Sequence, residues 1–200
     1  MSIWKVKNSR VLWPSGGNRK TMRNGLFYIL LMLILMQSSC KKGEIPPTSG
    51  TATIDNTTTL GQTYYVYGFL FSEAKKVSTL GDPVDVITIS AEVDINNVIT
   101  RITFNANTYK ESFFLFGEYS DATAASLAFK NLTSFSNPQW IDSPVTVKLN
   151  QIWLFRTTQN KYAKIRVVNT VAEKRNNIPY AECTFEWEYQ PDGTLTFPGK

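Results

Sequence analysis

Residues 151–167 read QIWLFRTTQNKYAKIRV, and this stretch decides the fold class. Apolar, aromatic and β-branched residues fill both of its halves, which is typical of β-strands, while the polar residues between the halves suit a turn. With the turn at residues 159–160, the sequence predicts an antiparallel hairpin in which Leu154 pairs with Ile165.

That pairing places aliphatic side chains on one face of the hairpin and rings and cations on the other. We call the second set the predicted binding face; it comprises Trp153, Phe155, Tyr162, Lys164 and Arg166. A cation over an aromatic ring gains about 0.5–2 kcal/mol, and the same face suits a flat ligand that carries carboxylates. The alternative is a second layer of core with two long basic side chains that reach solvent. A one-residue shift of the turn would invert one strand relative to the other.

More strands are expected on both sides of the hairpin. The expected strands are 64–71, 86–93, 98–104, 112–119, 145–149, 151–157, 162–168 and 180–189. One helix is expected over 122–132, because Ser120 and Asp121 suit its N-cap. Its buried face is expected to carry the residues at helical spacing, which are Ala124, Leu127, Ala128 and Leu132. Strands at this spacing with one short helix predict an all-β antiparallel fold.

Apolar and polar side chains alternate along residues 181–189. The alternation places Cys183 on the buried face, where a free cysteine behaves as a small hydrophobe. Glu186 and Glu188 then lie on the opposite face, which we expect to be solvated. Their backbones are about 6.6 Å apart along the strand, so a carboxylate-based glycosidase is a third function, less favoured than the two given below.

An export signal begins the chain. Residues 25–36 (GLFYILLMLILM) form an unbroken apolar run that follows three basic residues, Arg19, Lys20 and Arg23. A helix of this length covers about 18 Å, which is too short for a bilayer core of about 30 Å. A basic flank, a short apolar run and small residues after it predict a signal peptide over 1–39. Because a start at Met22 gives a signal of ordinary length, residues 1–21 are expected to lie upstream of the true start.

Ser38-Ser39-Cys40 resembles the lipobox of bacterial lipoproteins, in which small residues precede an obligatory cysteine. Gln37 stands where an aliphatic residue is usual. The sequence therefore predicts a lipid on Cys40 and a membrane partner, since two or more acyl chains anchor a protein stably. The polar residues 40–59 are expected to form a flexible tether, and residues 60–200 a single β-rich domain.

The positive charge of the chain belongs to its leader. The net charge of +5 becomes −1 without residues 1–39, which hold six basic residues and no acidic one, so 15 basic residues remain against 16 acidic ones. A nucleic-acid partner requires a basic footprint, so none is expected. The chain has no histidine, and its two cysteines are Cys40 and Cys183. Histidine-based catalysis and a thiolate metal cluster are therefore excluded, and we expect no enzyme.

Two stretches, 152–167 (IWLFRTTQNKYAKIRV) and 185–193 (FEWEYQPDG), resemble the C-terminal half of HmuY-type lipoproteins. In that family an Arg-Thr, a turn and a Lys-Tyr-Ala-Lys precede a last aromatic strand that ends in Gln-Pro-Asp-Gly. Residues 69–78 (FLFSEAKKVS) are more loosely similar to an early strand of the family. The resemblance covers about half of the chain after Cys40.

The resemblance implies an all-β lipoprotein of the Gram-negative outer membrane that works beside a TonB-dependent receptor in haem uptake. Members ligate the haem iron through pairs of histidines or methionines. This chain has no histidine, and its four methionines all precede Cys40, so no family ligand carries over. Haem is a cofactor by resemblance alone, with tyrosine as the remaining type of axial ligand.

Two functions stay open from the sequence. The first is a binding lipoprotein for a tetrapyrrole or another flat, partly anionic molecule. The second is a structural or accessory envelope lipoprotein without a small-molecule ligand. Residues 41–44 (KKGE) lack an acidic cluster, so the cell surface and the periplasmic face of the outer membrane are both compatible locations.

Overall fold

The computed structural model describes residues 45–58, 65–106 and 111–198. The predicted signal peptide and Cys40 lie outside the described residues. Apart from Ile45, the described residues belong to one compact unit, Pro46–Lys200. They form antiparallel strands and one short α-helix, so the predicted fold class is confirmed.

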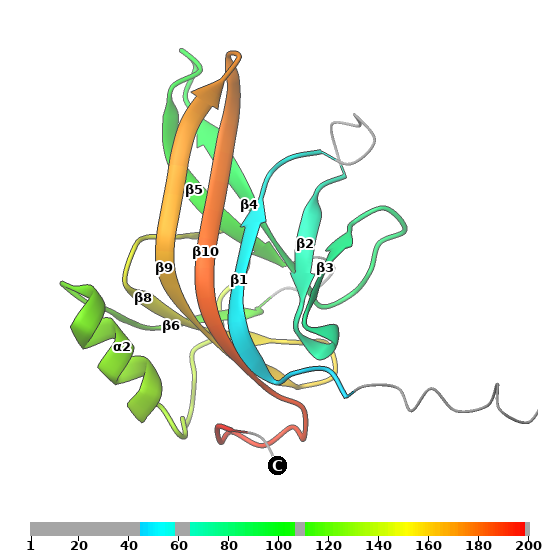
Figure 1. Cartoon of the computed structure of the whole chain (residues 1–200), viewed down its shortest axis with the longest axis vertical. Helices are drawn as coiled ribbons and strands as arrows, with labels where there is room; N and C mark the ends of the chain where they lie inside the picture. Colours follow the sequence, from blue (N-terminus) through cyan, green and yellow to red (C-terminus); the bar gives the residue numbers. More distant parts are fainter. Residues whose placement is uncertain (1–44, 59–64, 107–110, 199–200) are drawn as a thin grey trace, which may run out of the picture. The chain divides into compact units, whose positions relative to one another are not determined.

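Two five-stranded antiparallel sheets make up the domain (Figure 1). The first sheet has the order β1 (Ser49–Asp55), β10 (Ile178–Gln190), β9 (Tyr162–Arg175), β8 (Gln151–Arg156), β6 (Phe113–Glu118). The second has the order β3 (Lys75–Ser78), β2 (Tyr67–Leu70), β4 (Val86–Val93), β5 (Ile99–Ala106), β7 (Val145–Thr146). A short 3-10 turn, η2 (Phe71–Glu73), joins β2 to β3.

The main core lies between the two sheets, where aromatic rings from both meet. Phe69 of β2 packs against Phe185 and Trp187 of β10, with ring centroids 5.7 and 5.2 Å apart. Cys183 is fully buried in the same cluster, as its alternating strand predicts. Burial raises the pKa of its thiol, so Cys183 acts as a hydrophobe and not as a nucleophile.

The helix α2 (Ala122–Asn131) packs on the other face of the first sheet, over a second, smaller cluster. Its predicted N-cap is confirmed, because the side chain of Asp121 accepts a hydrogen bond from the backbone N–H of Ala124 at 2.8 Å. The predicted buried face is right only in part. Leu132 is buried and Ala128 packs against the second cluster, but the buried residues within the helix are Ala125 and Phe129, and Leu127 is 60% exposed. Because the helix is rich in alanine, apolar residues at helical spacing lie on two of its faces, and the sequence pattern does not show which face is buried.

The hairpin of residues 151–167 exists, but its predicted register is wrong by one residue. Leu154 pairs with Lys164 and not with Ile165. The turn decides this: the backbone N–H of Thr157 donates to the carbonyl of Lys161, and the Thr157 hydroxyl accepts from the Lys161 N–H. Three residues therefore close the loop, with Asn160 in the left-handed region at φ 53°, as three-residue hairpin loops require.

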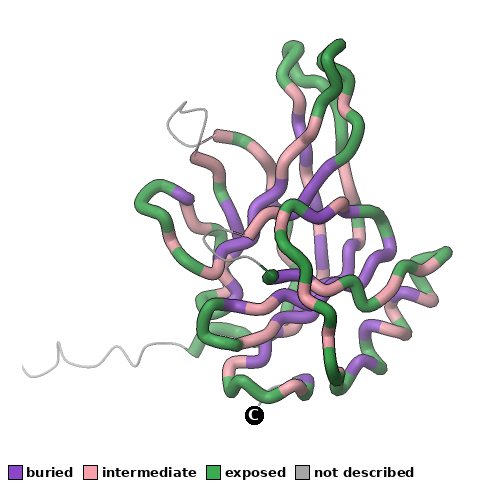
Figure 2. The backbone as a smooth tube through the Cα atoms, turned by 180° about the vertical axis from the view of Figure 1, so that it is seen from behind, coloured by how far each residue is buried: buried purple, intermediate pink, exposed green. Residues whose placement is uncertain are grey.

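The expected tether over 40–59 is also wrong in its second half. Ser49–Asp55 form β1, and all seven residues pair with β10. Most of the strand is exposed, with Ile54 as its buried anchor, so its polar composition concealed an edge strand. Strands β9 and β10 run further than predicted, up to the turn at Asn176-Asn177, and β3 was not predicted. Figure 2 shows exposed backbone concentrated at such hairpin ends.

Candidate functional site

A buried lysine lies where β9 passes under α2. The ammonium group of Lys164 donates to the carbonyls of Phe129 (3.0 Å) and Leu132 (2.9 Å) and lies 2.8 Å from the carboxylate of Glu188. Its side chain is 3% exposed. These contacts use all three donors of the ammonium, so Lys164 holds the C-terminal end of α2 and has no free donor for a ligand.

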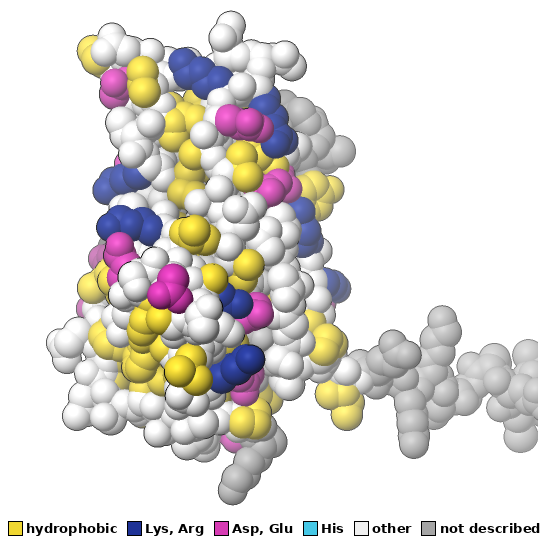
Figure 3. Space-filling view, turned by 60° about the vertical axis from the view of Figure 1, so that its left-hand side comes forward, with side chains coloured by type: hydrophobic (Ala, Val, Ile, Leu, Met, Phe, Trp, Pro, Cys, Tyr) yellow, Lys and Arg dark blue, Asp and Glu magenta, His cyan; other side chains and the backbone are white. Residues whose placement is uncertain are grey.

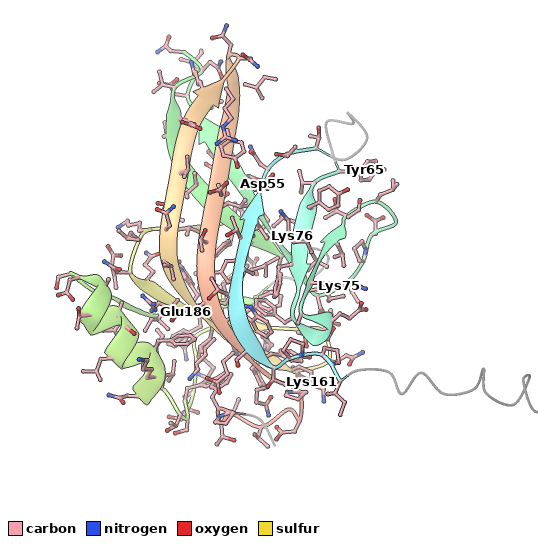
Figure 4. The ribbon with its side chains drawn as sticks, in the orientation of Figure 1. Asp55, Tyr65, Lys75, Lys76, Lys161 and Glu186 are labelled. Atoms are coloured by element: carbon pink, nitrogen blue, oxygen red, sulfur yellow. The ribbon has the colours of Figure 1, made fainter. Side chains whose placement is uncertain are left out.

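A second ion pair lies beside it on the same face. The guanidinium of Arg166 makes two contacts of 2.8 Å, through Nε and a terminal nitrogen, with one carboxylate oxygen of Glu186, which is labelled in Figure 4. Each pair joins residues directly opposite each other on β9 and β10, the arrangement in which cross-strand charges stabilise a sheet.

The prediction that Glu186 and Glu188 form a solvated face is therefore wrong. The Glu188 side chain is 17% exposed and that of Glu186 36% exposed, and each is paired with a cation. Alternation along β10 identifies the face opposite the main core, but it cannot tell solvent from a covering helix. Here α2 and its flanking segments supply that cover.

The structure divides the predicted binding face between two layers. Trp153 and Phe155 point into the core between the sheets, 3% and 1% exposed. Tyr162, Lys164 and Arg166 point to the opposite face of the first sheet. The one-residue difference in register is the cause, because it inverts β8 relative to β9. The five residues thus form no common surface.

Tyr162 belongs to an aromatic cluster below α2. Its ring stacks on Trp140 at 5.9 Å between centroids, and Phe135 meets it edge-on at 5.5 Å. The guanidinium of Arg156 lies 4.8 Å above the Trp140 ring. These rings lie at one end of the face that α2 covers. They contact one another and Arg156, so Tyr162 has a structural role.

An open groove of about 510 Å³ runs between α2 and β9. Its lining is Ala122, Thr123, Ser126, Leu127, Lys130, Arg166 and Val168. The volume lies within the range of roughly 300–1,000 Å³ that small-molecule sites occupy. Figure 3 brings the α2 side forward and shows hydrophobic side chains interspersed with both charges.

The groove offers apolar surface and two cations to a ligand. Leu127 and Val168 provide the apolar contact area, while Lys130 is exposed at one side and Arg166 lies at the floor. Glu186 offsets part of the Arg166 charge. Such a surface suits a flat molecule with one or two carboxylates. Arg166 is the one member of the predicted binding face among the residues that line it.

Sequence reasoning missed the contribution of the helix to this groove. Thr123, Ser126, Leu127 and Lys130 recur at spacings of three and four, which places them along one side of a helix. That signal was in the sequence, but Leu127 was assigned to the buried face.

Among the described residues, no three metal-ligating side chains lie together. In the same part of the chain, no helix is long and apolar enough to cross a membrane.

These features define the class of the protein: a two-sheet antiparallel β domain with a helix and an open groove on the outer face of its first sheet. No family model and no curated protein matches the chain. Among solved structures it is similar to a candidate lipoprotein of Bacteroides fragilis NCTC 9343, with 15% identity over 71% of this chain and 89% of that chain, and a TM-score of 0.34. A similarity of this size carries no argument about fold or function.

Proposed function

We propose that this protein is a lipid-anchored binding protein of the bacterial envelope that holds a flat, partly anionic small molecule in the groove between α2 and β9. The groove is the observation that carries the binding role, because it joins apolar surface to Lys130 and Arg166. The role is binding and not catalysis.

The anchor rests on the signal segment and the Ser38-Ser39-Cys40 motif. The first strand begins at Ser49, so eight residues separate Cys40 from the sheet. At no more than about 3.6 Å per residue, these span at most about 30 Å. The domain is therefore held close to the membrane by the end at which β1 begins. We propose the outer membrane as its location and a TonB-dependent receptor as its partner, following the resemblance to HmuY-type lipoproteins.

Haem fits the groove only in part. The lining supplies cations for propionates, but it contains no histidine, methionine, cysteine or tyrosine that could ligate iron. We therefore propose that a tetrapyrrole, or another planar carboxylate, is held through its carboxylates and its ring surface, without a bond to a metal.

The test is a titration of residues 41–200, which contain both core clusters, with haemin and with protoporphyrin. We expect a shifted Soret band that saturates in the micromolar range with both compounds. Leu127→Glu and Lys130→Glu should each weaken binding by tenfold or more, because they place negative charge at the groove.

Matched controls carry the same changes at exposed sites elsewhere. Ile95→Glu in the turn between β4 and β5, and Lys174→Glu near the end of β9, should leave affinity unchanged. Equal effects of control and groove variants would place the ligand outside the groove. No spectral shift at all would favour the structural or accessory lipoprotein, a role that the ion pairs of Lys164 with Glu188 and of Arg166 with Glu186 also suit.

A further inference from the structure

A second cavity lies away from the groove, beside the turn η2. It has a volume of about 350 Å³ and is bounded by η2, by the loop before β4 and by the turn between β8 and β9. None of the residues that line the groove borders it. Its walls combine apolar side chains, such as Leu70 and Val84, with polar ones, such as Asp85 and Gln159.

Asp85 presents a fixed negative charge to this cavity. One carboxylate oxygen accepts from the backbone N–H of Thr158 at 2.6 Å, and the other accepts from the Thr158 hydroxyl at 3.0 Å. Both donors are neutral, and no ion pair joins Asp85 to a cation of the described residues. Its backbone is left-handed at φ 63°, a conformation that these two bonds help to hold.

Tyr189 lines the same cavity. Its side chain is 7% exposed, and its ring stacks on Phe71 at 6.4 Å with an angle of 15°. No other described residue shares a hydrogen bond with the hydroxyl oxygen, although Tyr189 lines the cavity. Burial raises the pKa of Tyr189, and the negative charge of Asp85 raises it further.

We propose that this cavity binds a small primary amine, whose ammonium group contacts the Asp85 carboxylate and the Tyr189 hydroxyl while its apolar body packs on Leu70 and Val84. An ammonium carries three donors and no acceptor, which matches one carboxylate and one hydroxyl oxygen. An anion would meet the negative charge of Asp85, since Glu73, the other carboxylate of the lining, is paired with Lys75. Among the described residues, no group of three His, Cys, Asp or Glu side chains that could hold a metal ion gathers at this cavity.

The experiment compares three probes of one shape. Residues 41–200, labelled with ¹⁵N, are titrated at pH 7 with 4-phenylbutylamine, 4-phenylbutanol and 4-phenylbutyrate. We expect the amine to shift the amide signals of residues 70–73, 85 and 157–159 and to saturate below about 1 mM. The alcohol should bind at least tenfold more weakly, and the carboxylate should leave these signals in place.

Two variants assign the effect to Asp85. Asp85→Asn keeps an acceptor for Thr158 and tolerates the left-handed backbone, and it should weaken amine binding tenfold or more. Asp82→Asn is the matched control, because Asp82 lies in the same loop at φ 50° but does not line the cavity. Equal shifts by amine and carboxylate, or an Asp85→Asn variant that binds the amine unchanged, would overturn the proposal.

Discussion

Lys164 is buried although its side chain is charged. Lysine is almost never buried unless it is paired, and here one side chain joins the carboxylate of Glu188 to two carbonyls at the end of α2. The rings of Phe129 and Phe197 lie 4.7 and 5.2 Å from the ammonium. Lys164, which the sequence predicted as a ligand contact, therefore joins the helix to the sheet.

Lys164→Met should destabilise the domain strongly. The substitution leaves the Glu188 carboxylate without its cation in a site of low exposure, and loss of one partner of a buried pair costs about 3–5 kcal/mol. Urea denaturation followed by circular dichroism measures the change. The double variant Lys164→Met with Glu188→Leu should recover part of the loss.

The matched control is Lys75→Met, which removes the cation of the exposed Lys75–Glu73 pair. An exposed pair contributes no more than about 1 kcal/mol. If Lys164→Met cost no more than this control, the buried pair would not hold α2 in place.

At the scale of elements, alternation of apolar and polar residues predicted most strands, and the helix cap was recognisable from Asp121. Alternation does not determine the register between two strands, nor whether a helix covers the outer face of a sheet. The hairpin register depends on a hydrogen bond between Thr157 and Lys161, and a one-residue change moved Trp153 from the predicted binding face into the core. The sequence did not predict β1, because an edge strand buries few side chains. Of the predicted binding face, only Arg166 borders the groove.

The approach of β2 to β4 depends on a glycine. A methyl group on Gly68 would lie 2.2 Å from a methyl carbon of Val86 and 2.6 Å from the carbonyl oxygen of Ile87. Gly68→Ala should therefore destabilise the domain by about 1–3 kcal/mol through overpacking, measured as a lower urea midpoint.

Gly50 in β1 is the matched position for this test. There a methyl group would meet the Trp187 ring at 3.5 Å, which is an ordinary contact. Because alanine orders a strand at a lower entropic cost than glycine, Gly50→Ala should be neutral or stabilising by up to about 1 kcal/mol. Equal losses at both positions would contradict the close approach at Gly68.

At the scale of the whole molecule, several carboxylates tie elements together. The backbone N–H of Ala124 lowers the pKa of Asp121, and hydrogen bonds from Gln151 and Lys148 lower that of Glu118. For Asp55, burial raises the pKa, but Thr57 and Lys76 outweigh it and the net change is downward. Asp55 of β1 and Lys76 of β3, labelled in Figure 4, join the two sheets at 3.2 Å.

These lowered pKa values set the response to acid. A carboxyl whose pKa is lower in the folded state stabilises the fold above its unfolded pKa, and that contribution is lost as the pH falls through the folded value. The ordinary values are 3.8 for aspartate and 4.5 for glutamate. The urea midpoint should therefore be level from pH 7 to about 5 and fall below about pH 4. A midpoint that rises on acidification would contradict these assignments.

The proposed function depends on a lipid anchor at Cys40, since that anchor would make this domain an envelope protein and would hold it to the membrane by the end at which β1 begins. The most direct test is mass spectrometry of the N-terminal peptide of the protein purified from its membrane fraction. We predict a chain that begins at Cys40 and carries two or three acyl chains, and a Cys40→Ala variant that leaves the membrane fraction. A wild-type chain that retains residues 22–39 and is found, like the variant, in the soluble fraction would contradict the account.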